Sequence, residues 1–192
     1  LRLDFSGTDA PTSNILNNAG SSSALVLGGG KLDIVGAAGA TNSQQFNGLT
    51  VNAGNSALAL TAGTGGGVPT VNVGATLTRA AGGTLNVTDA TGGNVTTSAT
   101  TTLTNSVLSM SASNPTAFAT VNGTDWATYA SGIKALSSYA TGNANYTTTN
   151  NIDVTDGDSV SGVTVNSLRF NSATDALTLA GTNTVNTGGV LV

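Results

Sequence analysis

Residues 49–60 read LTVNAGNSALAL, and the same pattern returns at residues 168–179 as LRFNSATDALTL. A looser copy runs over residues 16–27 as LNNAGSSSALVL. Each copy holds a short alternating strand, a turn of small residues and Asn, and a second alternating strand. A unit this small cannot bury its own apolar face, so its repetition is typical of solenoids, in which each coil covers the next. The pattern therefore predicts an elongated all-β protein.

The composition of the 192-residue chain points the same way. Thr, Ser, Asn, Gly and Ala make up about two thirds of it, while 7% of the residues are charged and 4% are aromatic. All nine acidic residues are Asp, which serves turns, and none is Glu, which is typical of exposed helix surfaces. Val, Leu and Thr alternate repeatedly, which disordered chains lack. We therefore expect ordered β-structure rather than helix or disorder.

The residue types also limit the function. The chain has no His and no Cys, so it lacks the usual general base near neutral pH and the thiolate nucleophile. Its five cations are scattered along the sequence, which predicts no cluster of cations with Asp: Arg2, Lys31, Arg79, Lys134 and Arg169. We expect no enzyme, with a polysaccharide-degrading β-helix as the catalytic alternative. A net charge of −4 indicates no nucleic-acid partner, and no apolar run reaches the ~20 residues of a membrane helix.

Three stretches can be separated along the chain. Residues 1–113 are predicted to be β-solenoid coils, with strands at 24–27, 31–35, 49–51, 57–61, 70–73, 76–78 and 84–87. Residues 114–150 hold the single Trp and all three Tyr, and are predicted to be an irregular insertion or loop packed on the solenoid, with a helical turn or two within 126–136. Residues 151–192 are predicted to return to coils that continue beyond the chain end.

Side-chain direction and coil length follow from the repeat. Because side chains alternate along a strand, Leu58 and Leu60 are expected to point inward, and Ala57, Ala59 and Thr61 outward. The offset between the copies at 16–27 and 49–60 suits either one large coil or two small ones.

Three segments carry a resemblance to a known family. They are residues 23–36 (SALVLGGGKLDIVG), 118–127 (FATVNGTDWA) and 164–171 (TVNSLRFN), and they resemble the autotransporter-associated β-strand repeat proteins. These are long secreted or surface proteins of Gram-negative bacteria. The resemblance implies a right-handed parallel β-helix, located extracellularly or on the outer cell surface, with a structural or adhesive role. Apart from the resemblance, uncapped strand edges at the solenoid ends predict assembly into extracellular fibres. The family has no shared catalytic residues, so the resemblance predicts none.

One acidic cluster is a candidate metal site. Asp153, Asp156 and Asp158 surround Gly157, and closely spaced carboxylate oxygens are the ligands that Ca²⁺ prefers. The alternative is a solvated turn in which each Asp makes local bonds. No other cofactor is predicted.

The aromatic residues are a candidate ligand site. Trp126, Tyr129 and Tyr139 could present a stacking surface for sugar rings, which makes a carbohydrate-binding module the alternative function. Alternatively, these rings could cover exposed core beside the solenoid wall or plug a coil.

Partners follow from the predicted architecture. Both chain ends look cut from a longer protein and uncapped, so self-association through solenoid ends or faces is expected. Carbohydrate or other cell-surface partners are the remaining prediction.

Overall fold

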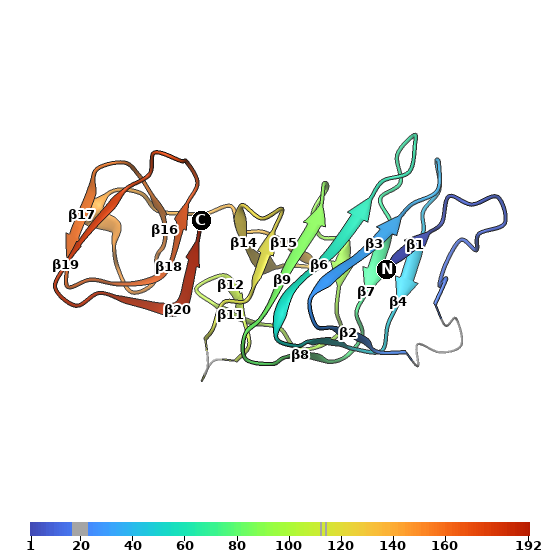
Figure 1. Ribbon diagram of the computed structural model, residues 1–192, viewed down its shortest axis with the longest axis horizontal. Helices are drawn as coiled ribbons and strands as arrows, with labels where there is room; N and C mark the ends of the chain where they lie inside the picture. The colour runs from blue at the N-terminus through green and yellow to red at the C-terminus, as the bar shows by residue number, and fades with distance from the viewer. Residues whose placement is uncertain (17–22, 112, 114) are drawn as a thin grey trace.

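The computed structural model describes residues 1–16, 23–111, 113 and 115–192, and in these the protein is all-β (Figure 1). The one helical element there is a short 3₁₀ turn, η1 (Asn143–Asn145). The turn expected within the copy at 16–27 falls on residues 17–22, and the expected boundary at Asn114 also lies outside the described residues.

Residues 25–96 run in three circuits of the chain, each made of three strands. The first circuit holds β2 (Leu25–Leu27), β3 (Gly30–Val35) and β4 (Ser43–Gln45). The second holds β5 (Leu49–Val51), β6 (Gly54–Thr61) and β7 (Thr70–Asn72), and the third holds β8 (Leu77–Arg79), β9 (Gly83–Asp89) and β10 (Val95–Thr96). Corresponding strands pair in parallel from circuit to circuit. We call these the N-terminal circuits.

The largest sheet curls because it includes two sides of these circuits. Its strand order is β1-β3-β6-β9-β13-β14-β15-β10-β7-β4, where β1 is Arg2–Asp4, β13 is Ala119–Val121, β14 is Asp125–Tyr129 and β15 is Ile133–Ala135. The pairs β13–β14, β14–β15 and β10–β15 are antiparallel, so these strands join the two parallel runs at one end. The third side is the separate sheet β2-β5-β8.

Residues 151–191 form a second set, with two circuits of two strands each and one further strand. Here β16 (Asn151–Val154), β18 (Thr164–Phe170) and β20 (Thr184–Leu191) pair in parallel, as do β17 (Asp158–Ser161) and β19 (Leu177–Ala180). We call these the C-terminal circuits. The antiparallel hairpin of β11 (Thr102–Thr104) and β12 (Val107–Ser109) lies between the two sets (Figure 1).

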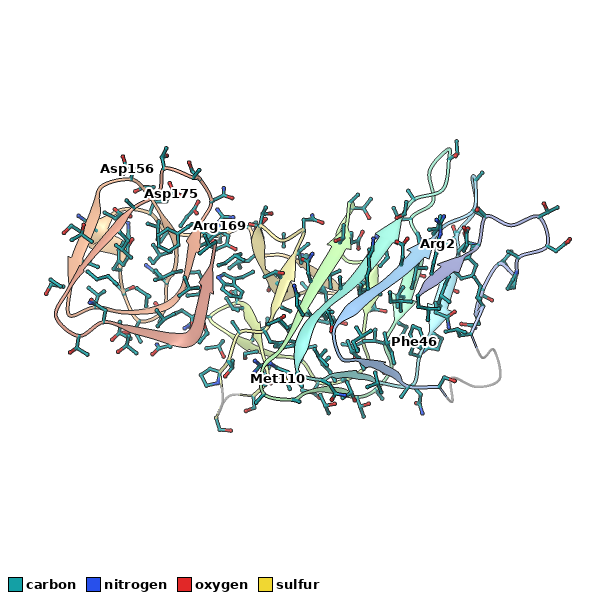
Figure 2. The ribbon with its side chains drawn as sticks, in the orientation of Figure 1. Arg2, Phe46, Met110, Asp156, Arg169 and Asp175 are labelled. Carbon is teal, nitrogen blue, oxygen red and sulfur yellow. The ribbon has the colours of Figure 1, made fainter. Side chains whose placement is uncertain are left out.

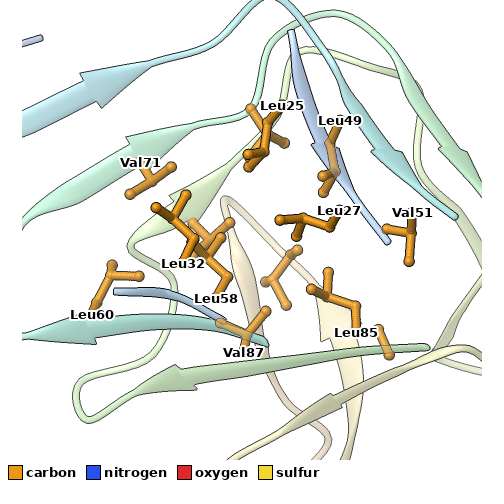
Figure 3. Packing of buried hydrophobic residues seen from close by; sticks show 14 of the residues in the cluster. Leu25, Leu27, Leu32, Leu49, Val51, Leu58, Leu60, Val71, Leu85 and Val87 are labelled. Atoms are coloured by element: carbon orange, nitrogen blue, oxygen red, sulfur yellow. The ribbon is translucent and has the colours of Figure 1, made fainter. Parts of the chain in front are cut away.

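Aliphatic side chains stack in register inside the N-terminal circuits (Figure 3). Leu58 pairs with Leu32 of the circuit before and with Val87 of the circuit after, and all three are buried. Leu60 is also buried, and Thr61 is exposed, as the alternation predicts. Ala59 is an exception, because this outward methyl group is 5% exposed. Short side chains between neighbouring strands are thus covered even on the outer face.

The number of residues per circuit varies along the chain. In the N-terminal circuits, Leu25 pairs with Leu49 and Leu49 pairs with Leu77, so the second circuit is somewhat longer than the first. The C-terminal circuits are shorter, since Ile152 already pairs with Leu168. The offset between the sequence copies is therefore not the length of a circuit, because it would place Leu25 beside Leu58, whereas Leu25 pairs with Leu49.

The prediction of a helical turn within residues 126–136 is wrong. This stretch holds β14, a turn and β15 instead. Trp126 and Ala127, which point to opposite faces of β14, are both buried, so the strand shows no apolar alternation that could identify it.

No helix among the described residues has the length and apolar character to cross a bilayer.

Candidate functional site: the junction between the two sets of circuits

The side chains with the most specific contacts lie where the two sets of circuits meet. The sheet β16-β18-β20 faces β12 and β14, and Figure 2 shows Arg169 on this side of the C-terminal circuits. Val107, Trp126 and Leu136 form a small buried cluster here, with Tyr139 and Leu191 packed against it. We refer to this region as the junction.

Arg169 of β18 ties the two sets together by charge. Its Nε and Nη2 donate to the two carboxylate oxygens of Asp153 on β16, at 2.9 and 2.6 Å. Its Nη1 donates to Asp125 of β14, which belongs to the large sheet. The Arg169 side chain is only 11% exposed, so this two-carboxylate clamp is largely shielded from water.

Tyr139 lies under the same guanidinium. The Cζ atom of Arg169 is 3.8 Å from the centroid of the Tyr139 ring, the distance of a cation–π contact. The backbone N–H of Trp126 donates to the Tyr139 hydroxyl at 2.9 Å, and the Trp126 indole donates to the carbonyl of Leu168 at 3.2 Å. Burial raises the pKa of Tyr139 to about 12, so the phenol stays neutral at ordinary pH.

A buried polar network forms a second bridge. Asn166 is fully buried, and its amide donates to Asn151 Oδ1 at 2.7 Å and to the Thr104 carbonyl at 3.1 Å. The Asn105 amide in turn donates to Asn166 Oδ1, and the Asn151 amide donates to the Asn105 carbonyl. The turn of the β11–β12 hairpin is thereby fastened to β16 and β18, and every bond satisfies a group that would be costly to bury alone.

A cleft of about 350 Å³ opens beside this network. It is lined by the hairpin turn, by residues 138–140 that precede the C-terminal circuits, and by residues 149–151 at the start of β16. Among the described residues, the side chains that line it are amides, hydroxyls, one methyl group and the Tyr139 ring, and none of them is charged.

The three aromatic residues predicted as a ligand surface do not form one face. Trp126 is 6% exposed and packs inside the junction. The Tyr129 hydroxyl bonds the backbone of Thr97, at 2.9 and 3.3 Å, on the side of the N-terminal circuits. Of the three, Tyr139 lines the polar cleft. Trp126 and Tyr129 thus have the contacts of packed residues, and the ligand role of the three aromatic residues stays a prediction.

The three carboxylates predicted as a Ca²⁺ site point to different partners. Asp153 holds Arg169, and the buried Asp158 accepts bonds from the Tyr146 hydroxyl at 2.9 Å and from the Thr155 N–H at 3.0 Å. Asp156 is exposed (Figure 2). In the part of the chain that the structure describes, no three ionisable side chains are grouped to hold a metal ion. The Ca²⁺ site stays a prediction.

Sequence reasoning missed the ion-pair cluster and the buried amides of the junction. The prediction that no cation clusters with Asp is wrong, because Arg169 bonds both Asp125 and Asp153. Asp125 and Arg169 lie far apart along the chain, and no local pattern links them. The buried Asn151 and Asn166 stand in a chain where Asn occurs at most turns, so residue type alone does not single them out.

Comparison with known proteins finds one informative local similarity. Over 75 residues, which are 39% of this chain, the sequence is 41% identical to the adhesin BmaC autotransporter of Brucella suis biovar 1 (strain 1330). The match covers 2% of the length of that protein. No protein-family model and no solved structure matches the chain. The all-β chain is therefore similar, over part of its length, to an autotransporter adhesin.

Proposed function

We propose that this chain is an adhesive segment of a secreted or cell-surface bacterial protein, built as a right-handed parallel β-helix. The similarity to an autotransporter adhesin supports the surface location and the adhesive role. The observation that supports the parallel β-helix is the parallel register of the strands, in which Leu32, Leu58 and Val87 of successive circuits stack on one another.

Such a segment would work by geometry rather than by chemistry. Ladders of backbone hydrogen bonds join each circuit to the next, so each set of circuits would be a stiff unit that holds its outer faces in place. Outward hydroxyls add bonds of their own, as between Thr50 and Thr78 at 2.9 Å. The absence of His, Cys and Glu from the sequence supports a non-catalytic role without a cofactor.

Adhesion can be measured with beads coated with the chain and applied to cell monolayers and to immobilised glycans. Retention well above that of albumin-coated beads is expected, and beads coated with heat-unfolded chain are the matched control. Equal retention of folded and unfolded chain would count against a specific adhesive surface. Electron microscopy of the same preparation tests assembly into fibres, for which long uniform filaments are the expected sign.

A further inference from the structure

The cleft at the junction has the size of a small-molecule site. Its volume of about 350 Å³ falls within the ~300–1,000 Å³ usual for such sites. Three separate parts of the chain form its walls, and the Arg169 clamp and the Asn166 network hold these parts in place. A site fixed in this way needs little ordering when a ligand enters.

Hydroxyl groups line the cleft and are available for bonding. Within the described residues, the side chains of Ser106, Ser138 and Thr149 bond to no other protein group, and all three are exposed. The amides of Asn105 and Asn150 are already used, by Asn166 and by the Asn145 carbonyl. The hydroxyls are therefore free to donate and accept, while the amides keep the walls rigid.

Ser106 occupies a position that favours glycine. It follows Asn105 in the turn between β11 and β12, and both residues have positive φ, 72° for Ser106 and 45° for Asn105. Asn-Gly is the preferred pair in such a turn, because Gly has no Cβ to strain. A side chain kept at a strained position beside a cleft is a feature of functional sites.

Charge and aromatic surface narrow the ligand class. No charged side chain of the described residues lines the cleft, and the nearby Arg169 is already held by two carboxylates. A phosphate, sulfate or carboxylate group would thus find no free cation there. Tyr139 adds an aromatic surface suited to the apolar face of a ligand that is otherwise polar.

We propose that this cleft binds a neutral sugar residue of a surface glycan, with the hydroxyls of Ser106, Ser138 and Thr149 bonding the sugar and Tyr139 contacting its ring. This proposal rests on the proposed adhesive function and names what the segment would recognise.

The test compares Ser106→Gly with Ser131→Gly. Both serines have positive φ, and glycine relieves the backbone at either position, so both variants should fold as well as the parent chain or better. Ser131 lies in the β14–β15 turn, away from the residues that line the cleft. Its variant therefore controls for the backbone change without removing a cleft hydroxyl.

The probes are immobilised neutral oligosaccharides of glucose, galactose and mannose, with sialylated and sulfated oligosaccharides on the same surface. We expect a neutral oligosaccharide to bind, Ser106→Gly to weaken its affinity roughly fivefold, as loss of one hydrogen bond does, and Ser131→Gly to leave it unchanged. Thr149→Ala should weaken it similarly. Binding of acidic oligosaccharides alone, no binding at all, or equal binding by all variants would overturn the proposal.

The bead assay separates this proposal from the adhesive function. If beads adhere but soluble neutral oligosaccharides do not compete and Ser106→Gly has no effect, adhesion stands and the glycan site fails. If the chain binds neutral oligosaccharides but its beads do not adhere, the site stands and the adhesive function fails.

Discussion

Trp126 lies so close to Gly189 that a Cβ atom at position 189 would stand 2.8 Å from Cζ2 of the indole. The ring thus contacts the backbone of β20 directly. We expect Gly189→Ala to lower the free energy of unfolding by about 1–3 kcal/mol, because the added methyl group must displace a buried ring. Urea unfolding followed by Trp fluorescence measures it. Gly7→Ala is the control, since a Cβ there meets only the Ala10 Cβ at 3.7 Å. Equal effects of the two changes would refute the close-packing argument.

Arg169→Lys should destabilise the junction by about 2 kcal/mol, because a lysine cannot reproduce the two-pronged bond to Asp153 together with the bond to Asp125. One shielded carboxylate would then lose its partner. Arg2→Lys is the matched control, because the Arg2 side chain is 58% exposed in its pair with Asp4 and such pairs contribute little. Thermal unfolding of both variants gives the comparison. If the Arg169 clamp did not stabilise the fold, the two variants would have the same melting temperature.

Asn166→Asp should cost about 2 kcal/mol or more, because it leaves buried polar groups without donors. The change removes the amide donors to Asn151 Oδ1 and the Thr104 carbonyl and sets a carboxylate against both oxygens. At the exposed Asn186, whose amide bonds the Thr148 carbonyl, the same change should stay within about 0.5 kcal/mol. Chemical unfolding tests both. Hydrogen exchange should also speed up in the β11–β12 hairpin of Asn166→Asp, and unchanged exchange there would contradict its role as a bridge.

Alkaline pH should destabilise the folded chain through Tyr139. Its pKa is about 12 when folded and about 10 when unfolded, so above pH 10 the unfolded state releases a proton that the folded state keeps. The contribution of Tyr139 to the free energy of unfolding is complete below pH 10 and is lost as the pH rises toward 12. Burial and the bond to Asp158 raise the pKa of Tyr146 too, so Tyr146 adds to the loss of stability at alkaline pH. Unfolding midpoints between about pH 8 and 11 should decline less steeply in Tyr139→Phe, and parallel slopes would contradict the assignment.

The strands of the N-terminal circuits could be predicted because their two faces differ. Leu49–Val51 was expected and is β5, and the expected strand at 57–61 lies inside β6. Register could not be predicted, since both strands of the repeat carry large apolar residues at alternate positions. Leu25 could thus be aligned with Leu58, whereas it pairs with Leu49. The polar strand β4 (Ser43–Gln45) gave no apolar signal, although Gln44 is buried.

The candidate site was less predictable than the fold. Tyr139 was singled out as an aromatic ligand residue, and it does line the cleft. Ser106, Ser138 and Thr149 carried no signal, because hydroxyl residues occur throughout the chain and only the folded backbone brings these three together.

The C-terminal circuits appear almost end-on in Figure 1, whereas the N-terminal circuits are seen from the side. The axis around which the circuits wind therefore changes direction at the junction. A filament that contained such a bend would reach less far than its contour length. A pull on its tip would first straighten this elbow and load the Arg169 and Asn166 contacts before the ladders on either side. The bend at the junction would then extend under load before the two sets of circuits on either side of it.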